Sequence, residues 1–469
     1  MKKFIGLAIG FIALFGFAAS AFAIHAEIPS ETQAVVAKGT VQITISGDLR
    51  VRGWLKKNVA ANTFLGGTGS SIVDGQNQTY YDQRVRLAVD ASQGDVSGRI
   101  HLESNSNPDG DNGTHDIYTW GNFNSKPSGM DVLEAWIQYT GTGLLGVGSG
   151  IKVGHMPLAL GPDTLFFDHT KFGDDAIVGW VDPTPSTHIV GLTIKAKDAD
   201  PGSEVLGTSN AQDLDIYVGL VNQVLAGQNL QAYYVYANGP AAGLPIPVPG
   251  LGSVTFGPQI ALQDLGLNAS GSFGGLTYKA EYDQNLGSSY IGGPAGTKND
   301  LKGYALELDL GYKLGPAGIR LMGAIGSGPK NGQTNQNEFI NFLSANQYNT
   351  VVYGYQVANA MGQTNGSGTF NQLSNTEMLN LGVDLNPTAD LKVALDAYLL
   401  RATETSAFGP NVSKSIGSEY DLQANYAISK NLNYFVKGGA LVAGGFYSDS
   451  GIGQKKTAVV AMHGLELSF

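Results

Sequence analysis

Apolar and polar residues alternate with a period of two along most of the chain. Over residues 41–54 one phase holds Val, Ile, Leu and Gly, while the other holds Gln, Thr, Ser, Asp, Trp and two arginines. Period two predicts a β-strand. The segment is longer than the roughly 5 or 6 residues of a typical globular strand, and its two-sided composition suits a tilted strand that crosses a bilayer.

The same pattern recurs along the chain. Residues 81–90, 276–283 and 391–399 each place apolar or aromatic side chains on one phase and mostly charged or polar side chains on the other. Helical periodicity is almost absent after residue 23. The one weak exception, Phe339, Phe342 and Leu343, predicts a short helix within a loop.

The connections between these segments have two lengths. Short turns and long loops on opposite ends are typical of outer-membrane barrels, with the short turns in the periplasm. Consistent alternation of the two requires a separate strand over 175–181, which gives eighteen antiparallel strands, with sixteen as the alternative. The short turns are expected at 92–95, 226–229, 274–275, 315–318, 386–390 and 430–431, and the long loops at 55–79, 104–130, 238–258, 284–300, 327–374, 402–414 and 446–455.

Aromatic residues support the same arrangement. Amphipathic rings gather at both interfaces of a membrane protein, so a barrel should carry two belts on its outward phase. One set lies beside the expected short turns: Tyr139, Tyr278, Tyr312, Tyr426, Tyr434 and Phe469. The other lies near the long loops: Tyr81, Tyr236, Tyr282, Tyr304 and Tyr420.

The first residues indicate export. Lys2 and Lys3 precede an apolar run over 4–19 and the small-residue pattern Ala21-Phe22-Ala23, as in a secretory signal peptide. An uncleaved anchor is the alternative, but the run is shorter than the roughly 20 residues of a spanning helix. We expect a signal peptide at 1–23, a periplasmic segment at 24–40 and the transmembrane barrel at 41–469.

Composition removes several classes of function. The chain has no cysteine, which excludes disulfides, thiolate metal sites and a cysteine nucleophile. Its net charge of −11 disfavours nucleic acid as a partner. No zinc, haem or phosphate-loop motif is present, and we expect no cofactor and no enzymatic activity. Three aspartates in one long loop, Asp109, Asp111 and Asp116, form a weak candidate for a Ca²⁺ site, and a solvated turn is the preferred interpretation.

Three patches carry a resemblance to a known family. The chain ends Leu465-Glu466-Leu467-Ser468-Phe469, its first strand contains the sequence of 46–53 (SGDLRVRG), and residues 152–161 (KVGHMPLALG) precede 165–168 (LFFD). Together with the signal peptide, these patches resemble Gram-negative outer-membrane porins, in particular those of anaerobic metal-reducing bacteria. The resemblance implies a pore-forming barrel, a homotrimer and one loop folded inward as a constriction. His463 departs from the pattern, because it lies on the otherwise apolar phase of the last strand.

The inward phase supplies candidate pore residues. Arg50 and Arg52 should lie beside Arg84 and Arg86 on neighbouring strands, with Arg99, Lys152 and Lys195 further round the wall. Arginines without counter-charges need water or anions, which favours an open lumen. The expected inner loop, about 157–174, carries Asp163, Asp168 and Asp174, with Asp175 at its edge, and these acids could face the arginines. The alternative is that they only pair to hold the loop against the wall.

The functional hypothesis is an outer-membrane porin that lets small hydrophilic solutes or ions diffuse through a charged constriction. Its partners would be outer-membrane lipid and the solutes themselves. One alternative is a barrel that sheathes a partner, such as a periplasmic electron carrier, and it requires a wide lumen without an inward loop. A barrel hydrolase is a third possibility, for which a Ser or Asp bonded to a His at the rim would be the sign.

Overall fold

The structure is a computed structural model. It describes residues 35–38, 41–59, 72–105, 118–120, 129–142, 146–170, 173–197, 214–239, 245–248, 252–291, 297–331, 335–341, 350–353, 357, 360 and 373–469. The expected signal peptide and the aspartate-rich segment with Asp109, Asp111 and Asp116 lie outside the described residues. Among the described residues, no helix is both long and apolar enough to span a membrane.

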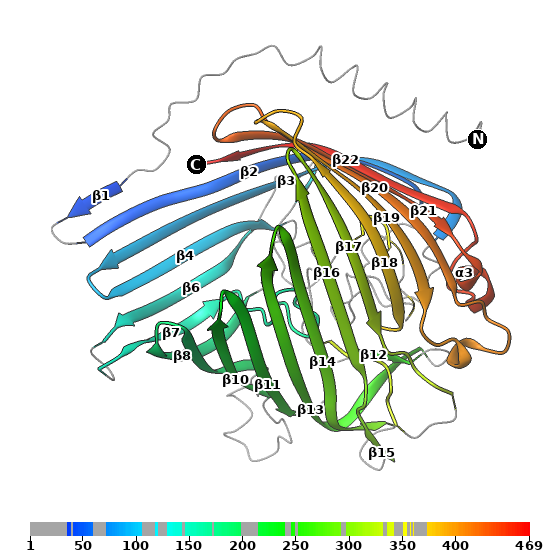
Figure 1. Cartoon of the computed structure of the whole chain (residues 1–469), viewed down its shortest axis with the longest axis horizontal. Coiled ribbons are helices and arrows are strands. Elements are labelled where there is room, and N and C mark those ends of the chain that lie inside the picture. Colours follow the sequence, from blue (N-terminus) through cyan, green and yellow to red (C-terminus); the bar gives the residue numbers. More distant parts are fainter. Residues whose placement is uncertain are drawn as a thin grey trace.

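Eighteen antiparallel strands form a closed β-barrel, as the alternation predicts. Each barrel strand pairs with the next, and the last pairs with the first (Figure 1). The barrel strands are, in chain order, β2 (Val41–Val59), β3 (Ile72–Gln93), β4 (Val96–Asn105), β6 (Gly129–Gly141), β7 (Gly148–Met156), β8 (Asp174–Thr184), β9 (Thr187–Lys197), β10 (Leu214–Leu225), β11 (Gln228–Gly239), β13 (Gly252–Phe273), β14 (Leu276–Ile291), β16 (Tyr304–Leu314), β17 (Ala317–Gly326), β18 (Thr376–Leu385), β19 (Leu391–Ala402), β20 (Ser415–Ala427), β21 (Leu432–Ala443) and β22 (Thr457–Ser468).

Short elements complete the described fold. Strand β1 (Val35–Lys38) folds back on the start of β2, and β5 (Tyr118–Thr119) pairs with the middle of β3. Strands β12 (Pro245–Val248) and β15 (Thr297–Asp300) pair with the ends of β13 and β14. A 3-10 helix, η2 (Ser406–Phe408), and a short α-helix, α3 (Gly445–Ser450), lie in connections. Residues 335–341 are not helical, and Phe342 and Leu343 of the expected short helix lie outside the described residues.

The ring closes between β2 and β22. Leu49 pairs with Leu467 and Val51 with Leu465 across the seam. Gly47 and Phe469 exchange two backbone hydrogen bonds of 2.8 and 3.0 Å. A Cβ at Gly47 would meet the ring of Phe469 at 2.8 Å, so the close approach of the two segments depends on a glycine. Closure leaves no unpaired edge strand in the barrel.

The two phases of the strands face opposite environments. Leu49, Leu87 and Leu381 are 38, 39 and 56% exposed on the outward phase. The aromatic residues Tyr81, Tyr304, Tyr312, Tyr420 and Tyr426 are exposed on the same outer surface. His463 also lies on the outward phase, where the rings of Tyr81 and Tyr434 flank it with centroids 6.3 and 6.1 Å away.

Several boundaries differ from the sequence-based expectation. The separate strand expected at 175–181 is present as β8, and the following turn is formed by Pro185 and Ser186. The loops expected at 55–79, 238–258 and 284–300 are shorter, because β2, β3, β13 and β14 extend into them. Polar residues such as those of 74–79 can continue a paired strand beyond the apolar band, so the change in composition does not mark the end of the strand.

Candidate pore constriction

The connection between β7 and β8, residues 157–173, folds into the barrel and is called the inner loop here. Its backbone turns back on itself, because the N–H of Leu160 donates to Phe167 O at 3.0 Å and the N–H of His169 donates to Leu158 O at 2.9 Å. At the tip, Gly161 and Thr164 adopt positive φ angles of 80° and 55°. The inner loop is therefore a compact reversal with its tip pointing away from its parent strands.

Apolar packing explains why the inner loop turns inward. Leu165, Phe166 and Phe167 are at most 2% exposed and belong to one buried cluster with wall residues of β9, β10 and β11. Those wall residues, Ile194, Ile216, Val218 and Val235, occupy the inward phase, which is apolar in this sector. Burying each large apolar side chain contributes roughly 1.5–3 kcal/mol, so wall and loop stabilise each other.

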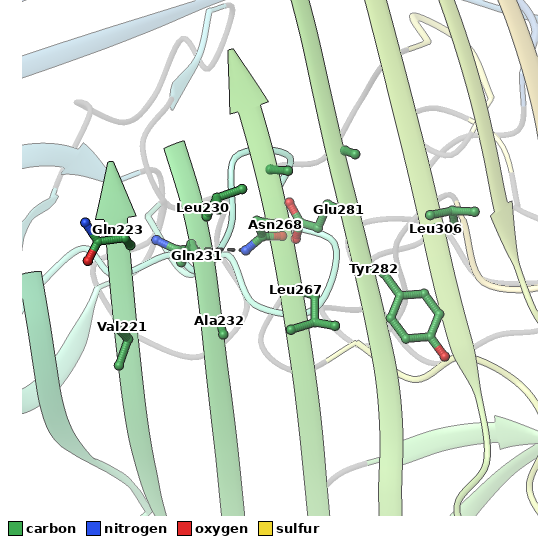
Figure 2. A pocket seen from close by; sticks show the side chains of 12 residues that line it. Val221, Gln223, Leu230, Gln231, Ala232, Leu267, Asn268, Glu281, Tyr282 and Leu306 are labelled. Carbon is green, nitrogen blue, oxygen red and sulfur yellow. Dashed lines mark hydrogen bonds between the residues drawn. The ribbon is translucent and has the colours of Figure 1, made fainter. Parts of the chain in front are cut away.

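The tip of the inner loop is fixed to β14 by a carboxylate. Glu281 accepts hydrogen bonds from the backbone N–H of Asp163 at 2.7 Å and of Leu165 at 3.0 Å. A Cβ at Gly161 would collide with the same carboxylate. In the row of side chains beside this contact, Asn268 donates to Gln231 at 2.9 Å on the neighbouring strands (Figure 2).

The acids predicted for the constriction have different positions. Asp163 pairs with Lys279 of β14. Asp168 accepts hydrogen bonds from the N–H and hydroxyl of Thr170 at 3.1 and 2.6 Å, and Asp174 pairs with His169 at 2.7 Å. These contacts fit the alternative interpretation, in which the acids pair to hold the inner loop against the wall.

Asp175 lies on the outer face. Its side chain is 74% exposed, shares the outward phase with Ile177, and pairs with His155 at 2.9 Å. Lys195 is also on the outward phase, where it pairs with Asp215 at 2.8 Å. The expectation that these two side chains line the lumen is wrong. The register of β8 and β9 places apolar residues at the inward positions of this sector, so Asp175 and Lys195 face outward.

The predicted arginines share the inward wall of β2, β3 and β4, but they have counter-charges. Arg52 binds Asp82 through two hydrogen bonds of 2.7 and 2.9 Å. The pairs Arg84–Asp48, Arg86–Glu103 and Arg99–Glu134 have N–O distances of 2.8, 2.8 and 3.1 Å. Arg50 lies opposite Arg84 on β3 and opposite Glu466 on β22. The expectation of an uncompensated cluster is wrong, since strand register brings an acid beside each paired arginine.

Between β17 and β18, the described parts of a second connection within residues 327–375 also fold inward, and they are called the second inner loop. Glu419 of β20 accepts hydrogen bonds from the N–H of Val352 at 2.6 Å and of Tyr353 at 2.8 Å. Asp421 accepts from the N–H of Val351 at 3.0 Å. On the other side, Asn285 of β14 exchanges two hydrogen bonds of 2.7 and 3.0 Å with the backbone of Ile340. The described parts of this loop thus connect two distant sectors of the wall.

Most of the described residues of the second inner loop are buried. Phe339, Val352 and Tyr353 are 0% exposed and pack in the same apolar cluster as inward residues of β19 to β22, including Leu400 and Leu441. Glu338 is 4% exposed, and burial raises its pKa to about 7. The sequence analysis predicts a long loop at 327–374 but not that its described parts fold inward. The available signal was its apolar runs, Phe339-Ile340 and Val351-Val352-Tyr353, within a segment expected to be solvated.

Charge is divided between two sides of the inner wall. The arginines lie on β2 to β4, whereas acids accumulate on β13 to β20, where Tyr233 donates a hydrogen bond to Asp283. The buried acids of this second side are Asp264, Glu281, Asp283, Glu307, Asp396, Glu419 and Asp421. The arginines of the first side are paired with acids such as Asp82 and Glu103, so the excess of acidic side chains lies on the second side.

No protein-family model and no curated protein matches the chain. Among solved structures, the chain is similar to OccK5 (OpdH) of Pseudomonas aeruginosa, with 12% identity, coverage of 91% of this chain and 98% of that one, and a TM-score of 0.50. For OccAB2 of Acinetobacter baumannii the corresponding values are 8%, 91%, 98% and 0.52. For the outer membrane channel DcaP of Acinetobacter baumannii they are 11%, 92%, 99% and 0.44. At these identities, the similarity to OccK5 and OccAB2 concerns the fold.

Proposed function

We propose that the chain is an outer-membrane porin through which small hydrophilic solutes or ions diffuse passively. One observation carries the proposal: charged side chains remain exposed inside a closed barrel whose outer surface is apolar. The inward side chains of Lys279, Arg320 and Asp384 keep 45, 38 and 42% of their surface exposed. Charged groups with this exposure require water, and water inside a barrel that spans a membrane provides a passage.

Two inward loops support a constricted passage. The inner loop reaches β14 at Glu281, and the second inner loop reaches it at Asn285. The space that remains between the docked loops and the arginine-bearing wall would be the constriction, with Arg50, Arg52, Arg84, Arg86 and Arg99 along one side. Fixed charges in a narrow aqueous passage favour polar, hydrated solutes and set the preference for cations or anions.

A sheath around a protein partner fits the geometry poorly. That function needs a lumen that is open from end to end, whereas both inner loops occupy the lumen and are fixed by buried apolar side chains such as Phe166 and Tyr353. Removing them would expose two apolar surfaces to water at a cost of several kcal/mol. We therefore assign the lumen to small solutes.

Planar-bilayer recording of the refolded mature protein tests the proposal. In a salt gradient we expect discrete conductance steps and a reversal potential whose sign shows whether the arginines or the acids dominate. A barrel that migrates as folded in a heat-modifiability assay but gives no current steps would refute it. The expected export and assembly belong to the same proposal: N-terminal sequencing should place the mature start near Ile24, and light scattering should give a homotrimer.

A further inference from the structure

A cluster of carboxylates from two separate segments lies where the inner loop meets the wall. Asp163 comes from the loop tip, and Glu307 and Asp309 come from β16. One ligand oxygen from each lies within 4.8 Å of the others. Strand register places Glu307 opposite Glu281 and Asp309 opposite Lys279. The cluster is thus formed only when the inner loop is docked.

The cluster has an oxygen that the protein leaves unbound. The Asp163 side chain is 7% exposed, and its Oδ2 atom is buried with no hydrogen-bond partner. Its other oxygen pairs with Lys279, which also approaches Asp309 Oδ2 at 3.2 Å. A buried carboxylate oxygen without a hydrogen-bond partner destabilises the fold, and a bound cation would remove that penalty.

Charge balance leads to the same conclusion. Three carboxylates face one ammonium group, which leaves excess negative charge in a half-buried site. We propose that Asp163, Glu307 and Asp309 bind a hard divalent cation, Ca²⁺, which fastens the tip of the inner loop to β16. All three ligands are oxygen donors, as Ca²⁺ prefers, and the lumen can supply water to complete six to eight ligands. The 28% exposed side chain of Asp309 leaves the site open to that water.

Lys279 and the cation would compete for the same oxygens. The lysine side chain is 45% exposed, so its ammonium group can swing into the lumen when the cation binds. This competition makes a prediction that a purely structural ion pair does not make. Replacing Lys279 by methionine should tighten calcium binding, because it removes the competing charge.

Isothermal titration of CaCl₂ into the EDTA-treated, refolded full chain tests the site. We expect one saturable site with a Kd on the order of 10⁻⁴–10⁻³ M, as in sites with few protein ligands. Asp309→Asn and Glu307→Gln should weaken binding at least about tenfold, Lys279→Met should strengthen it, and the control Asp384→Asn, an inward carboxylate on β18 outside the cluster, should leave it unchanged.

Three results would overturn the site. These are no calcium uptake by the wild-type chain at about ten times the weakest expected Kd, binding that Asp309→Asn leaves intact, or binding that Lys279→Met does not strengthen. The second result would place the ion elsewhere, for example at Asp109 and Asp111. The heat-modifiability assay verifies folding of each variant, and none of these readouts depends on the pore conducting.

Discussion

The backbone N–H of Leu165 donates to the carboxylate of Glu281 at 3.0 Å, although the two residues are 116 positions apart. Glu281→Gln removes the charge and turns one acceptor oxygen into a donor group that faces an N–H. We expect the tip of the inner loop to loosen by about 2 kcal/mol, because hydrogen bonds to charged groups contribute roughly 1.5–3 kcal/mol each. Single-channel traces should show a larger and noisier current. Gln231→Ala, in the same row but without a loop contact, is the control, and identical traces for both variants would refute the docking role.

The second inner loop should respond to Glu419→Gln. The charge that holds the N–H groups of Val352 and Tyr353 would be lost, so their amide hydrogens should exchange roughly 10–100 times faster, which corresponds to about 1.4–2.8 kcal/mol. Hydrogen exchange followed by mass spectrometry measures the change. Glu466→Gln, on β22 and paired only weakly with Arg84 at 3.7 Å, should leave exchange in this loop unaltered.

Glu338 should make docking of the second inner loop depend on pH. Its pKa of about 7 in the folded loop lies above the ordinary value of 4.5, so the folded loop retains the proton longer than the released loop does. The proton on Glu338 therefore stabilises the docked loop fully below about pH 4.5. About 3 kcal/mol of this stabilisation is lost as the pH rises to about 7. Exchange rates of loop amides at several pH values, corrected for intrinsic rates, should show this loss. Glu338→Gln should abolish it, and a slope that persists in this variant would assign the effect to another group.

Buried and exposed ion pairs should differ strongly in their effect on barrel stability. Arg52→Ala leaves the 1% exposed side chain of Asp82 without its counter-charge, and we expect a loss of about 3–5 kcal/mol. Arg401→Ala breaks a pair whose side chains are 62 and 37% exposed, and the loss should stay below about 1 kcal/mol. Denaturant unfolding of both variants in the same lipid compares them directly. Similar losses would contradict the described burial of Arg52.

Ion preference should depend on the arginines of β3. Replacing Arg84 and Arg86 together by alanine leaves Asp48 and Glu103 without their partners, so the lumen becomes more negative on that side. The reversal potential in a salt gradient should move toward cation preference, because fixed charge sets ion selectivity. An unchanged conductance and reversal potential would place the permeation path away from these residues.

The alternation of short turns and long loops predicted eighteen strands, with sixteen as the alternative, and the separate strand β8. This prediction is confirmed because antiparallel strands of a closed barrel must end alternately at its two rims. The extension of β2 to Val59 and the start of β3 at Ile72 were not predictable in this way, since polar strand ends outside the apolar band look like loops.

The partners of the pore residues could not be read from the sequence. Arg86 and Glu103 meet only because a particular register aligns β3 with β4, and a shift by one residue would separate them. The wall strand that a loop contacts is likewise not set by local sequence, since Val352 precedes β18 but donates a hydrogen bond to Glu419 of β20. One signal was available: residues 189–194 and 216–221 are mostly apolar on both phases, which indicates an inward surface that something must cover.

The apolar inner surface of β9 to β11 makes the packing inside the barrel asymmetric. Around Ile216 and Phe166 the side chains are fully buried, as in the core of a soluble protein, so a permeating molecule would have to avoid this sector. Its route would run off-centre, beside the strands that carry Arg84 and Arg86. On such an off-centre route a solute would stay close to one charged surface during its whole passage. The order in which it meets the charged side chains would then affect its rate of passage as much as the pore diameter does.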